Sequence, residues 1–237
     1  MTTIYLIRHG KTKGNLERRY VGRTDEPLCE AGRQEVSAFR EILMREFTAG
    51  REQAAGVATE FIEGQVYVSP LLRCRQTAEL LFADVAQKVV DDLREMDFGD
   101  FEYKNYTELA EDVRYQAFID SGGSMDFPNA ETQQQFRQRV RDAFARCMSS
   151  IEASMTKPET DLPQEPFVFV KRVHQNDVPE KPLFFVVHGG TIMAILEAYA
   201  EPHRDYFDWQ IATACGYRCE LAHTPDGLRL VNVTILC

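Results

Sequence analysis

The stretch LIRHGKT, residues Leu6–Thr12, is the most informative part of this chain of 237 residues. It closes a β-strand-like run, Thr3–Ile7, so that Arg8 and His9 stand side by side before a glycine turn. Ligands of α/β proteins bind at strand ends, and an arginine next to a histidine places a fixed cationic fork beside a nitrogen nucleophile. The pattern is therefore typical of a site where an imidazole meets a phosphate group.

A second copy of this pattern lies far along the chain. The apolar run Leu183–Val187 is followed by His188, two glycines and a helical pattern. One Arg-His-Gly tripeptide is a weak signal, because many proteins contain it by chance. Two strand-to-glycine turns that each carry a histidine are a stronger signal, and we expect His9 and His188 to share one site.

Element types alternate along the chain in the rhythm of an α/β sheet. Strands are predicted over Thr3–Ile7, Gln65–Val68, Lys88–Asp92 and Leu183–Val187, helices around Val36–Phe47, Leu71–Leu81, Tyr106–Ala117 and Phe136–Ile151, and a hairpin joining Gly216–His223 to Leu228–Leu236. The fold class that follows is α/β, a three-layer αβα sandwich with a mainly parallel sheet and an antiparallel edge hairpin.

No linker-like boundary separates two independent cores, so the prediction is one domain over residues 1–237. Two segments are poor in regular pattern and are interpreted as insertions, near residues 49–64 and 157–182. Within the second insertion, the run Phe167–Val170 is interpreted as an extra strand or hairpin arm.

Composition excludes several classes of partner. The formal net charge of −10 argues against nucleic acid and anionic membranes. No apolar run is long enough to span a bilayer, and the N-terminus lacks the pattern of a secretion signal, so we expect a cytoplasmic protein. Basic residues gather instead between Arg8 and Arg23, which predicts a small basic pocket for a small anion.

The six cysteines include no CxxC pair and no spacing that could assemble a zinc site. Buried or idle thiols are the preferred interpretation. No aspartate-rich or histidine-rich ligand set indicates another metal, and the sequence predicts neither a metal nor a cofactor.

Two further residues stand where an active site needs them. Arg73 falls in the first turn of the helix that follows the second strand, near the positive helix terminus. Glu95 follows the third strand and offers a carboxyl group beside the cations. It is the natural proton donor.

Five motifs together resemble the histidine phosphatase superfamily, also described as phosphoglycerate-mutase-like. They are RHGKT with Asn15 after it, GRTDEPL, SPLLRCRQTA, LREMDFGDFE and VVHGGT, and the match spans Ile4 to Thr191. The resemblance implies His9 as the nucleophile, His188 as its partner across the phosphate and Glu95 as acid and base.

The same resemblance implies Arg8 and Arg73 as the phosphate clamp and Asn15 as an added donor. The Gly189 amide is expected to help offset the charge of the phosphoryl oxygens. We also expect Thr24 and Arg23 to contact the substrate. Lone histidines are usually structural, but here four elements each place a reactive side chain just past a strand, which favours a shared catalytic site.

Hydrolysis is favoured over phosphate transfer, because a mutase must hold a second anionic group with extra cations. Met96 and Arg23 stand where the mutases it resembles carry Arg and Trp, and their paired arginines are reduced to Arg114. The segment Arg19–Leu28 most resembles the phosphatase branch that includes α-ribazole-phosphate phosphatases.

The expected function is a metal-independent phosphomonoesterase that acts through phosphohistidine on a small phosphorylated metabolite, with α-ribazole 5′-phosphate as one candidate. Two alternatives stay open. One is a cofactor-dependent phosphoglycerate mutase, and the other is a non-catalytic phosphate-binding or interaction protein, whose expected signature is the loss of a catalytic residue. The sequence leaves open whether the chain forms a homodimer.

Overall fold

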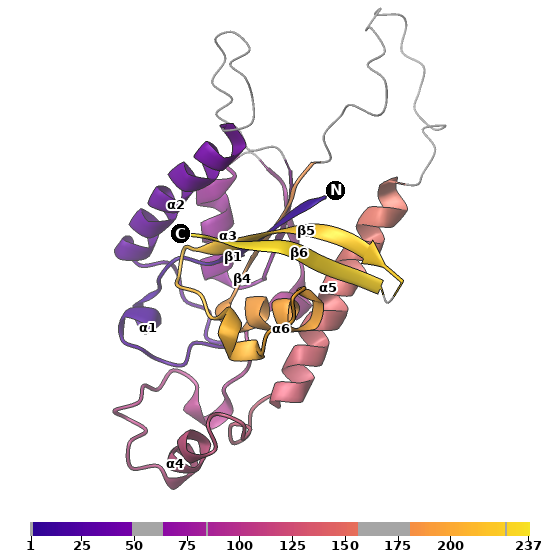
Figure 1. The fold of residues 1–237 in the computed structure, drawn as a ribbon. Coiled ribbons are helices and arrows are strands. Elements are labelled where there is room, and N and C mark those ends of the chain that lie inside the picture. The colour runs from indigo at the N-terminus through magenta and orange to yellow at the C-terminus, as the bar shows by residue number, and fades with distance from the viewer. Residues whose placement is uncertain (1, 49–63, 84, 156–180, 226) are drawn as a thin grey trace, which may run out of the picture.

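A computed structural model describes residues 2–48, 64–83, 85–155, 181–225 and 227–237 (Figure 1). Among these residues, one six-stranded sheet has the order β3-β2-β4-β1-β5-β6. The strands are β1 (Thr3–Arg8), β2 (Gln65–Val68), β3 (Gln87–Val89), β4 (Leu183–Val187), β5 (Gly216–Thr224) and β6 (Gly227–Leu236).

The first four strands of that order, β3, β2, β4 and β1, are mutually parallel. The last two differ, because β5 runs antiparallel to β1 and β6 antiparallel to β5. The predicted mainly parallel sheet with an antiparallel edge hairpin is confirmed.

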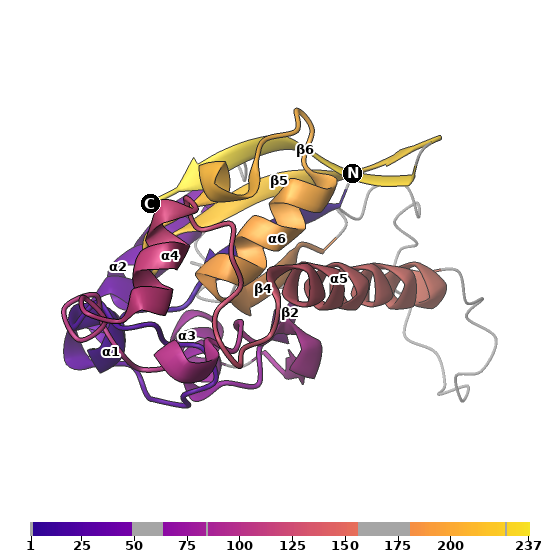
Figure 2. The same ribbon diagram turned by 90° about the horizontal axis from the view of Figure 1, so that it is seen from below.

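Helices cover both faces of this sheet (Figures 1 and 2). Alternate side chains of β1 point to opposite faces, as the pleat of a strand requires. Tyr5 and Ile7 belong to a core cluster with α2 (Glu30–Thr48) and α3 (Leu72–Leu81). Ile4 and Leu6 belong to a second cluster with α5 (Gln133–Met155) and α6 (Gly189–Tyr199). The three-layer αβα sandwich is therefore confirmed.

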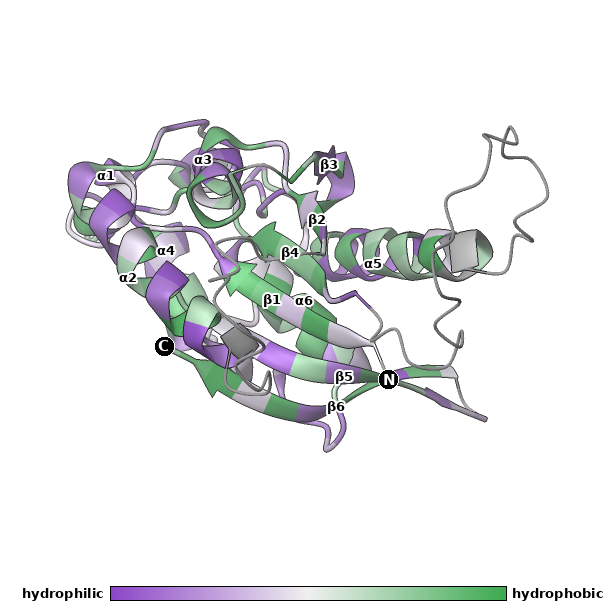
Figure 3. Cartoon of the chain, turned by 90° about the horizontal axis from the view of Figure 1, so that it is seen from above, coloured by the Kyte–Doolittle hydropathy of each residue, from purple (hydrophilic) through white to green (hydrophobic). Residues whose placement is uncertain are grey.

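The strand sequences reflect their places in the sheet. All five residues of β4 are apolar and buried, because the strand lies between β2 and β1 and is covered on both faces. In β5, nearer the sheet edge, polar and apolar residues are mixed, and Figure 3 shows this contrast between the uniformly hydrophobic β4 and the mixed β5.

One predicted strand and one predicted helix are shorter in the structure or begin later than expected. The strand predicted over Lys88–Asp92 ends at Val89 and continues into a 3-10 helix, η1 (Asp91–Leu93). The helix predicted around Tyr106–Ala117 begins only at Val113, as α4 (Val113–Asp120), because the Asp112 side chain caps it by accepting from the Arg114 amide. The residues before Asp112 form turns.

Four short elements complete the fold. They are the helix α1 (Lys13–Leu16) and the 3-10 helices η2 (Gly99–Phe101) and η3 (Tyr206–Trp209), besides η1. Helix α1 begins with a capping box, in which the Thr12 hydroxyl accepts from the Asn15 amide and the Asn15 side chain accepts from the Thr12 amide.

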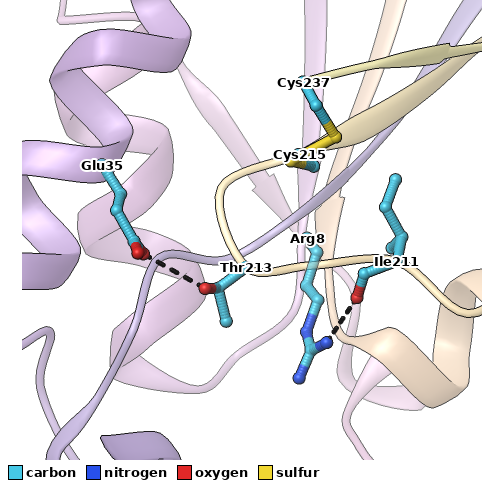
Figure 4. Close-up of a disulfide and its surroundings, with 6 residues drawn as sticks. All are labelled: Arg8, Glu35, Ile211, Thr213, Cys215 and Cys237. Carbon is cyan, nitrogen blue, oxygen red and sulfur yellow. Dashed lines mark hydrogen bonds between the residues drawn. A yellow bond between two sulfur atoms is a disulfide. The ribbon is translucent and has the colours of Figure 1, made fainter.

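The expectation of idle thiols is wrong for two cysteines. Cys215, just before β5, forms a disulfide with Cys237, just after β6, and their Cα atoms lie 4.8 Å apart (Figure 4). Antiparallel pairing of Gly216 with Leu236 brings the two cysteines together, although they are 22 residues apart. The other four cysteines are free thiols.

Almost all of the two predicted insertions lies outside the described residues, including the strand predicted over Phe167–Val170. The single-domain assignment stays a prediction. Within the part of the chain that the structure describes, no helix is both long and apolar enough to traverse a membrane.

Candidate active site

The two strand-end histidines are brought together by the pairing of β1 with β4. In this parallel register Arg8 lies opposite Val187, so the next residue on each strand is a histidine. The His9 amide donates to the Val187 carbonyl at 3.0 Å, and the ring centroids of His9 and His188 lie 5.1 Å apart. The pairing of β1 with β4 therefore places the two histidines side by side, and a catalytic site shared by them stays a prediction.

His9 is held as a neutral imidazole that is protonated at Nδ1. Its Nδ1 lies 2.7 Å from the Gly10 carbonyl, and because a carbonyl only accepts, Nδ1 carries the proton. Burial, together with the nearby guanidinium groups of Arg73 and Arg8, lowers the pKa of His9 well below its usual value. At neutral pH the Nε2 lone pair is therefore available for attack.

His188 is fully buried beside His9. Its Nε2 lies 2.7 Å from the Ser69 hydroxyl and 3.5 Å from the Cys74 sulfur. Burial and Arg73 lower the pKa of His188 well below its usual value. Burial also raises the pKa of the Cys74 thiol to about 12, so this cysteine stays protonated and is no nucleophile.

Two arginines approach the histidines from different elements. Arg73, from the first turn of α3, is fully buried and donates to the carbonyls of Thr24 and Gly22, each at 2.8 Å. Arg8 donates from Nη1 to the Ile211 carbonyl, which lies in the segment before the disulfide (Figure 4).

In both guanidinium groups the buried Nε–H donor is unused. Nε of Arg8 and Nε of Arg73 are buried and have no hydrogen-bond partner among the described residues. A buried N–H without a partner costs about 1–3 kcal/mol. Two such donors from cationic groups next to two neutral imidazoles form a site that an oxyanion would satisfy.

Glu95 supplies the carboxyl group of the site. Its two oxygens accept from the amides of Met96 at 3.0 Å and Gly190 at 3.1 Å. Burial raises the pKa of Glu95, and this effect exceeds the lowering by the two amides and by Arg73 and Arg8. The environment therefore favours the protonated acid.

The surroundings of Gly190 leave no room for a side chain. A Cβ at this position would collide with the Glu95 carboxyl group and lie 3.1 Å from the Tyr206 hydroxyl. The second glycine of the VVHGGT motif thus allows the carboxyl group to sit against the N-terminus of α6.

A cavity of about 470 Å³ opens onto this centre. Its lining includes Arg8, His9, Asn15, Glu95 and Gly189, five residues expected in the site. Arg73 and His188 are fully buried and are not among the lining residues, and the charge of Arg73 lowers the pKa of His9. The described residues contain no group of three or more His, Cys, Asp or Glu side chains that could hold a metal ion.

Arg23 and Thr24 were expected to contact the substrate, but the structure does not bring either side chain to this cavity. Arg23 is largely exposed and pairs with Asp97 at 3.2 Å. The Thr24 hydroxyl donates to Glu102, and this carboxylate also accepts from the amides of Thr24 and Gly22. Thr24 therefore shapes the loop whose carbonyls hold Arg73.

Sequence reasoning missed the support of the Glu95 loop. Arg139, on α5, donates to the carbonyls of Asp92 at 2.8 Å and Arg94 at 3.2 Å and pairs with Glu131 at 2.6 Å. Arg139 lies among apolar core positions of its helix, between Phe136 and Val140. A charged residue beside an apolar stripe is the signal that could have indicated it.

We expect Arg139→Lys to lower kcat about tenfold with little change in KM, because one ammonium group cannot hold two carbonyls and Glu131 together. Steady-state kinetics on a phosphomonoester would measure both constants. Arg146→Lys is the matched control, since Arg146 lies on the same helix and pairs with Asp92 at the surface. Equal losses in the two variants would contradict the positioning role.

A model of the histidine phosphatase superfamily (branch 1) matches residues 4–49 and 47–154. The chain belongs to the histidine phosphatase superfamily. The match contains Arg8, His9, Arg73 and Glu95, whereas His188 lies beyond it and joins them only through the fold. This histidine phosphatase superfamily chain is 30% identical over 158 residues to a Citrobacter koseri protein named "Probable phosphoglycerate mutase GpmB".

That alignment covers 65% of this chain and 66% of the Citrobacter protein, just under two thirds of its length. Solved structures of low identity share the fold. The α-ribazole phosphatase from Shigella flexneri is 19% identical with a TM-score of 0.67, over 97% of this chain and 94% of that one. Mycobacterial hydrolase 1 is 20% identical with a TM-score of 0.71, over 99% and 97%.

Proposed function

We propose that this histidine phosphatase superfamily member is a metal-independent phosphomonoesterase that acts on a small phosphorylated metabolite through a phosphohistidine at His9. The observation that carries the proposal is the pair of unpartnered, buried Nε–H donors of Arg8 and Arg73 next to the free Nε2 of His9. These groups match the needs of a phosphoryl group, which are anionic oxygens to be bound and a nucleophile in line.

In the first half-reaction, Nε2 of His9 attacks phosphorus and the bond to the alcohol oxygen breaks. The protonated Glu95 donates its proton to the leaving alkoxide, which departs as the neutral alcohol. Arg8, Arg73 and His188 stabilise the negative charge on the phosphoryl oxygens as the transition state forms.

In the second half-reaction, the Glu95 carboxylate takes a proton from water, and the resulting hydroxide attacks phosphorus. The bond between phosphorus and Nε2 breaks, His9 is restored as a neutral imidazole, and inorganic phosphate is released. Glu95 ends protonated, so one carboxyl group serves both half-reactions.

Phosphoglycerate mutase is the second candidate, favoured by the name of the Citrobacter relative. The cations around the centre weigh against it. Arg114 is paired with Asp100 and Asp112 at the surface, and Arg23 is paired with Asp97. Neither lines the cavity, so neither is placed to hold a second anionic group. The third candidate, a non-catalytic binding protein, is disfavoured because no element of the catalytic set is missing.

Within the phosphatase proposal, α-ribazole 5′-phosphate is a specific candidate substrate. The support is the fold shared with the Shigella flexneri α-ribazole phosphatase and the similarity of the segment Arg19–Leu28 to that branch. A cytoplasmic location likewise remains part of the proposal.

The test is hydrolysis of p-nitrophenyl phosphate in the presence of EDTA, followed by trapping with a ³²P-labelled phosphomonoester. We expect turnover with the chelator present and a labelled protein whose label is lost in acid and kept in alkali, as for a phosphoramidate. Incubation with 3-phosphoglycerate and its bisphosphate primer distinguishes the mutase. Efficient formation of 2-phosphoglycerate would overturn the choice of hydrolysis.

A further inference from the structure

Away from the proposed catalytic residues, the side chains that line the cavity are mostly apolar. Beyond the phosphate-binding groups, the lining is dominated by seven aromatic side chains, joined by Val21, Met96 and Met193. A cavity of about 470 Å³ is large enough for more than a phosphate group. The size and the lining of the cavity therefore affect which alcohol group of a phosphomonoester can bind.

Four of the aromatic rings form one connected group. Phe127 is its centre, with ring centroids 4.5 Å from Phe118, 5.3 Å from Phe98 and 5.4 Å from Tyr20. Phe118 belongs to α4, Phe127 to the loop between α4 and α5, Phe98 to the position just before η2, and Tyr20 to the loop after α1. Mutual edge and tilted contacts hold the rings in place, so this wall is preorganised before a ligand arrives.

A second aromatic group comes from η3. Tyr206 and Phe207 lie with their ring centroids 5.1 Å apart, and the Tyr206 hydroxyl donates to the Gly190 carbonyl at 3.3 Å. The two groups approach each other at Gly123, where a Cβ would lie 3.5 Å from the Phe118 ring and 3.7 Å from the Phe207 ring. Segments from opposite ends of the chain thus enclose one apolar space.

Cations available for a second anion are lacking among the described lining residues. Arg19 is bound by Glu17 and, through two donors, by Glu108. Arg137 pairs with Glu197 at 2.9 Å and stacks on the Tyr206 ring at 4.2 Å. Apart from these two, Arg8 is the only cation among the described lining residues, and it belongs to the proposed phosphate clamp.

We propose that this cavity selects phosphate monoesters whose alcohol carries an aromatic ring, over small aliphatic esters and over substrates with a second anionic group. The proposal rests on the proposed function, since it names the substrate class of the same site. Burial of the ring against Phe118 and Phe207 supplies binding free energy remote from phosphorus, and this energy can lower the barrier of the chemical step.

The test compares 2-phenylethyl phosphate with ethyl phosphate. Both release a primary alcohol, so the two substrates place similar demands on Glu95 and differ mainly in the ring. We expect kcat/KM to be roughly 10- to 100-fold higher for 2-phenylethyl phosphate, as burial of one aromatic side chain implies. Under the same conditions 3-phosphoglycerate should be the poorest substrate of the three.

Two variants test whether the aromatic side chains of the cavity cause the preference for 2-phenylethyl phosphate. Phe207 is 56% exposed, so Phe207→Ala removes a ring at the rim without opening the core. Phe118→Leu keeps an apolar side chain and removes only the ring. We expect each to lower the ratio of the two kcat/KM values several-fold. Ile235→Ala, at an exposed apolar residue of β6 outside the cavity, is the matched control and should leave the ratio unchanged.

Equal kcat/KM values for 2-phenylethyl and ethyl phosphate would overturn the aromatic preference and leave the phosphatase assignment intact. A ratio unaffected by both variants would also overturn it. If no phosphomonoester is hydrolysed and no phosphoenzyme forms, the proposed function itself fails, and the preference with it. Competitive inhibition by 2-phenylethylphosphonate against ethylphosphonate measures the same selection without turnover, and we expect the same order.

Discussion

Replacing His9 with alanine should abolish hydrolysis of phosphomonoesters, with kcat/KM lower by ~10⁴-fold or more, because the variant lacks the nitrogen that we propose as the nucleophile. His9 is held with Nδ1 toward the Gly10 carbonyl, so Nε2 is the nitrogen of this ring that is available for attack. Turnover of p-nitrophenyl phosphate and formation of the labelled phosphoenzyme would both be measured.

Two further variants make the His9 result interpretable. His9→Gln retains a polar side chain in the buried position and should be equally inactive, which separates loss of the nucleophile from loss of packing. His203→Ala alters an exposed histidine outside the cavity and should have wild-type activity. Substantial turnover by His9→Ala, or an acid-labile phosphoenzyme in that variant, would exclude His9 as the nucleophile.

Replacing Glu95 with glutamine should lower kcat for alkyl phosphates by about 10²- to 10⁴-fold, the range for loss of a general acid. The amide cannot give a proton to an alkoxide. The loss of phosphorylation rate should be much smaller with p-nitrophenyl phosphate, because nitrophenolate leaves readily without a proton. Single-turnover rates with the two substrates measure this difference, and phosphate binding should weaken far less than turnover.

Glu79→Gln is the matched control for this substitution, since Glu79 is an exposed carboxylate on α3 outside the cavity. It should leave both rates unchanged. A Glu95→Gln variant that loses the same factor with both substrates would argue against proton donation to the leaving group.

The pH dependence follows from the shifted groups of the same site. Attack requires neutral His9, whose pKa lies well below 6.5, so phosphorylation should be lost only as the pH falls through that low value. Donation requires protonated Glu95, whose pKa is raised above 4.5, so activity on alkyl phosphates should fall as the pH rises through the raised value. In Glu95→Gln the loss at high pH should disappear, whereas the loss at low pH should remain.

Much of the fold was accessible from the sequence because its signals are local. The buried apolar runs of β1 and β4 and the apolar stripes of α2 and α5 are each visible in short segments of the sequence. The exact ends of the helices and strands were harder to predict from the sequence. Helix α4 begins only after the Asp112 cap, and the 3-10 helix that begins at Asp91 shortens the third strand. Both boundaries depend on single side chains and local hydrogen bonds.

The candidate reactive groups could also be identified from short segments of sequence. Each of them follows a predicted strand: His9, His188, Arg73 and Glu95. Their role stays a prediction until the variants are measured. Arg23 and Thr24 show the limit of this reasoning, because proximity in sequence to a motif does not determine where a side chain points. The Arg23 side chain pairs with Asp97, and the Thr24 hydroxyl donates to Glu102.

By itself, the sequence determined the α/β architecture and predicted which side chains stand at the strand ends, because both are visible in short segments. Only the tertiary structure decided how far apart the histidines lie, which donors of Arg8 and Arg73 remain unused, and which cysteines pair. The aromatic wall is the clearest case. Tyr20 and Phe118 are 98 residues apart, Phe118 and Phe207 are 89 apart, and the three share no motif. Contacts between such distant segments depend on the packing of the whole chain, which no local pattern encodes.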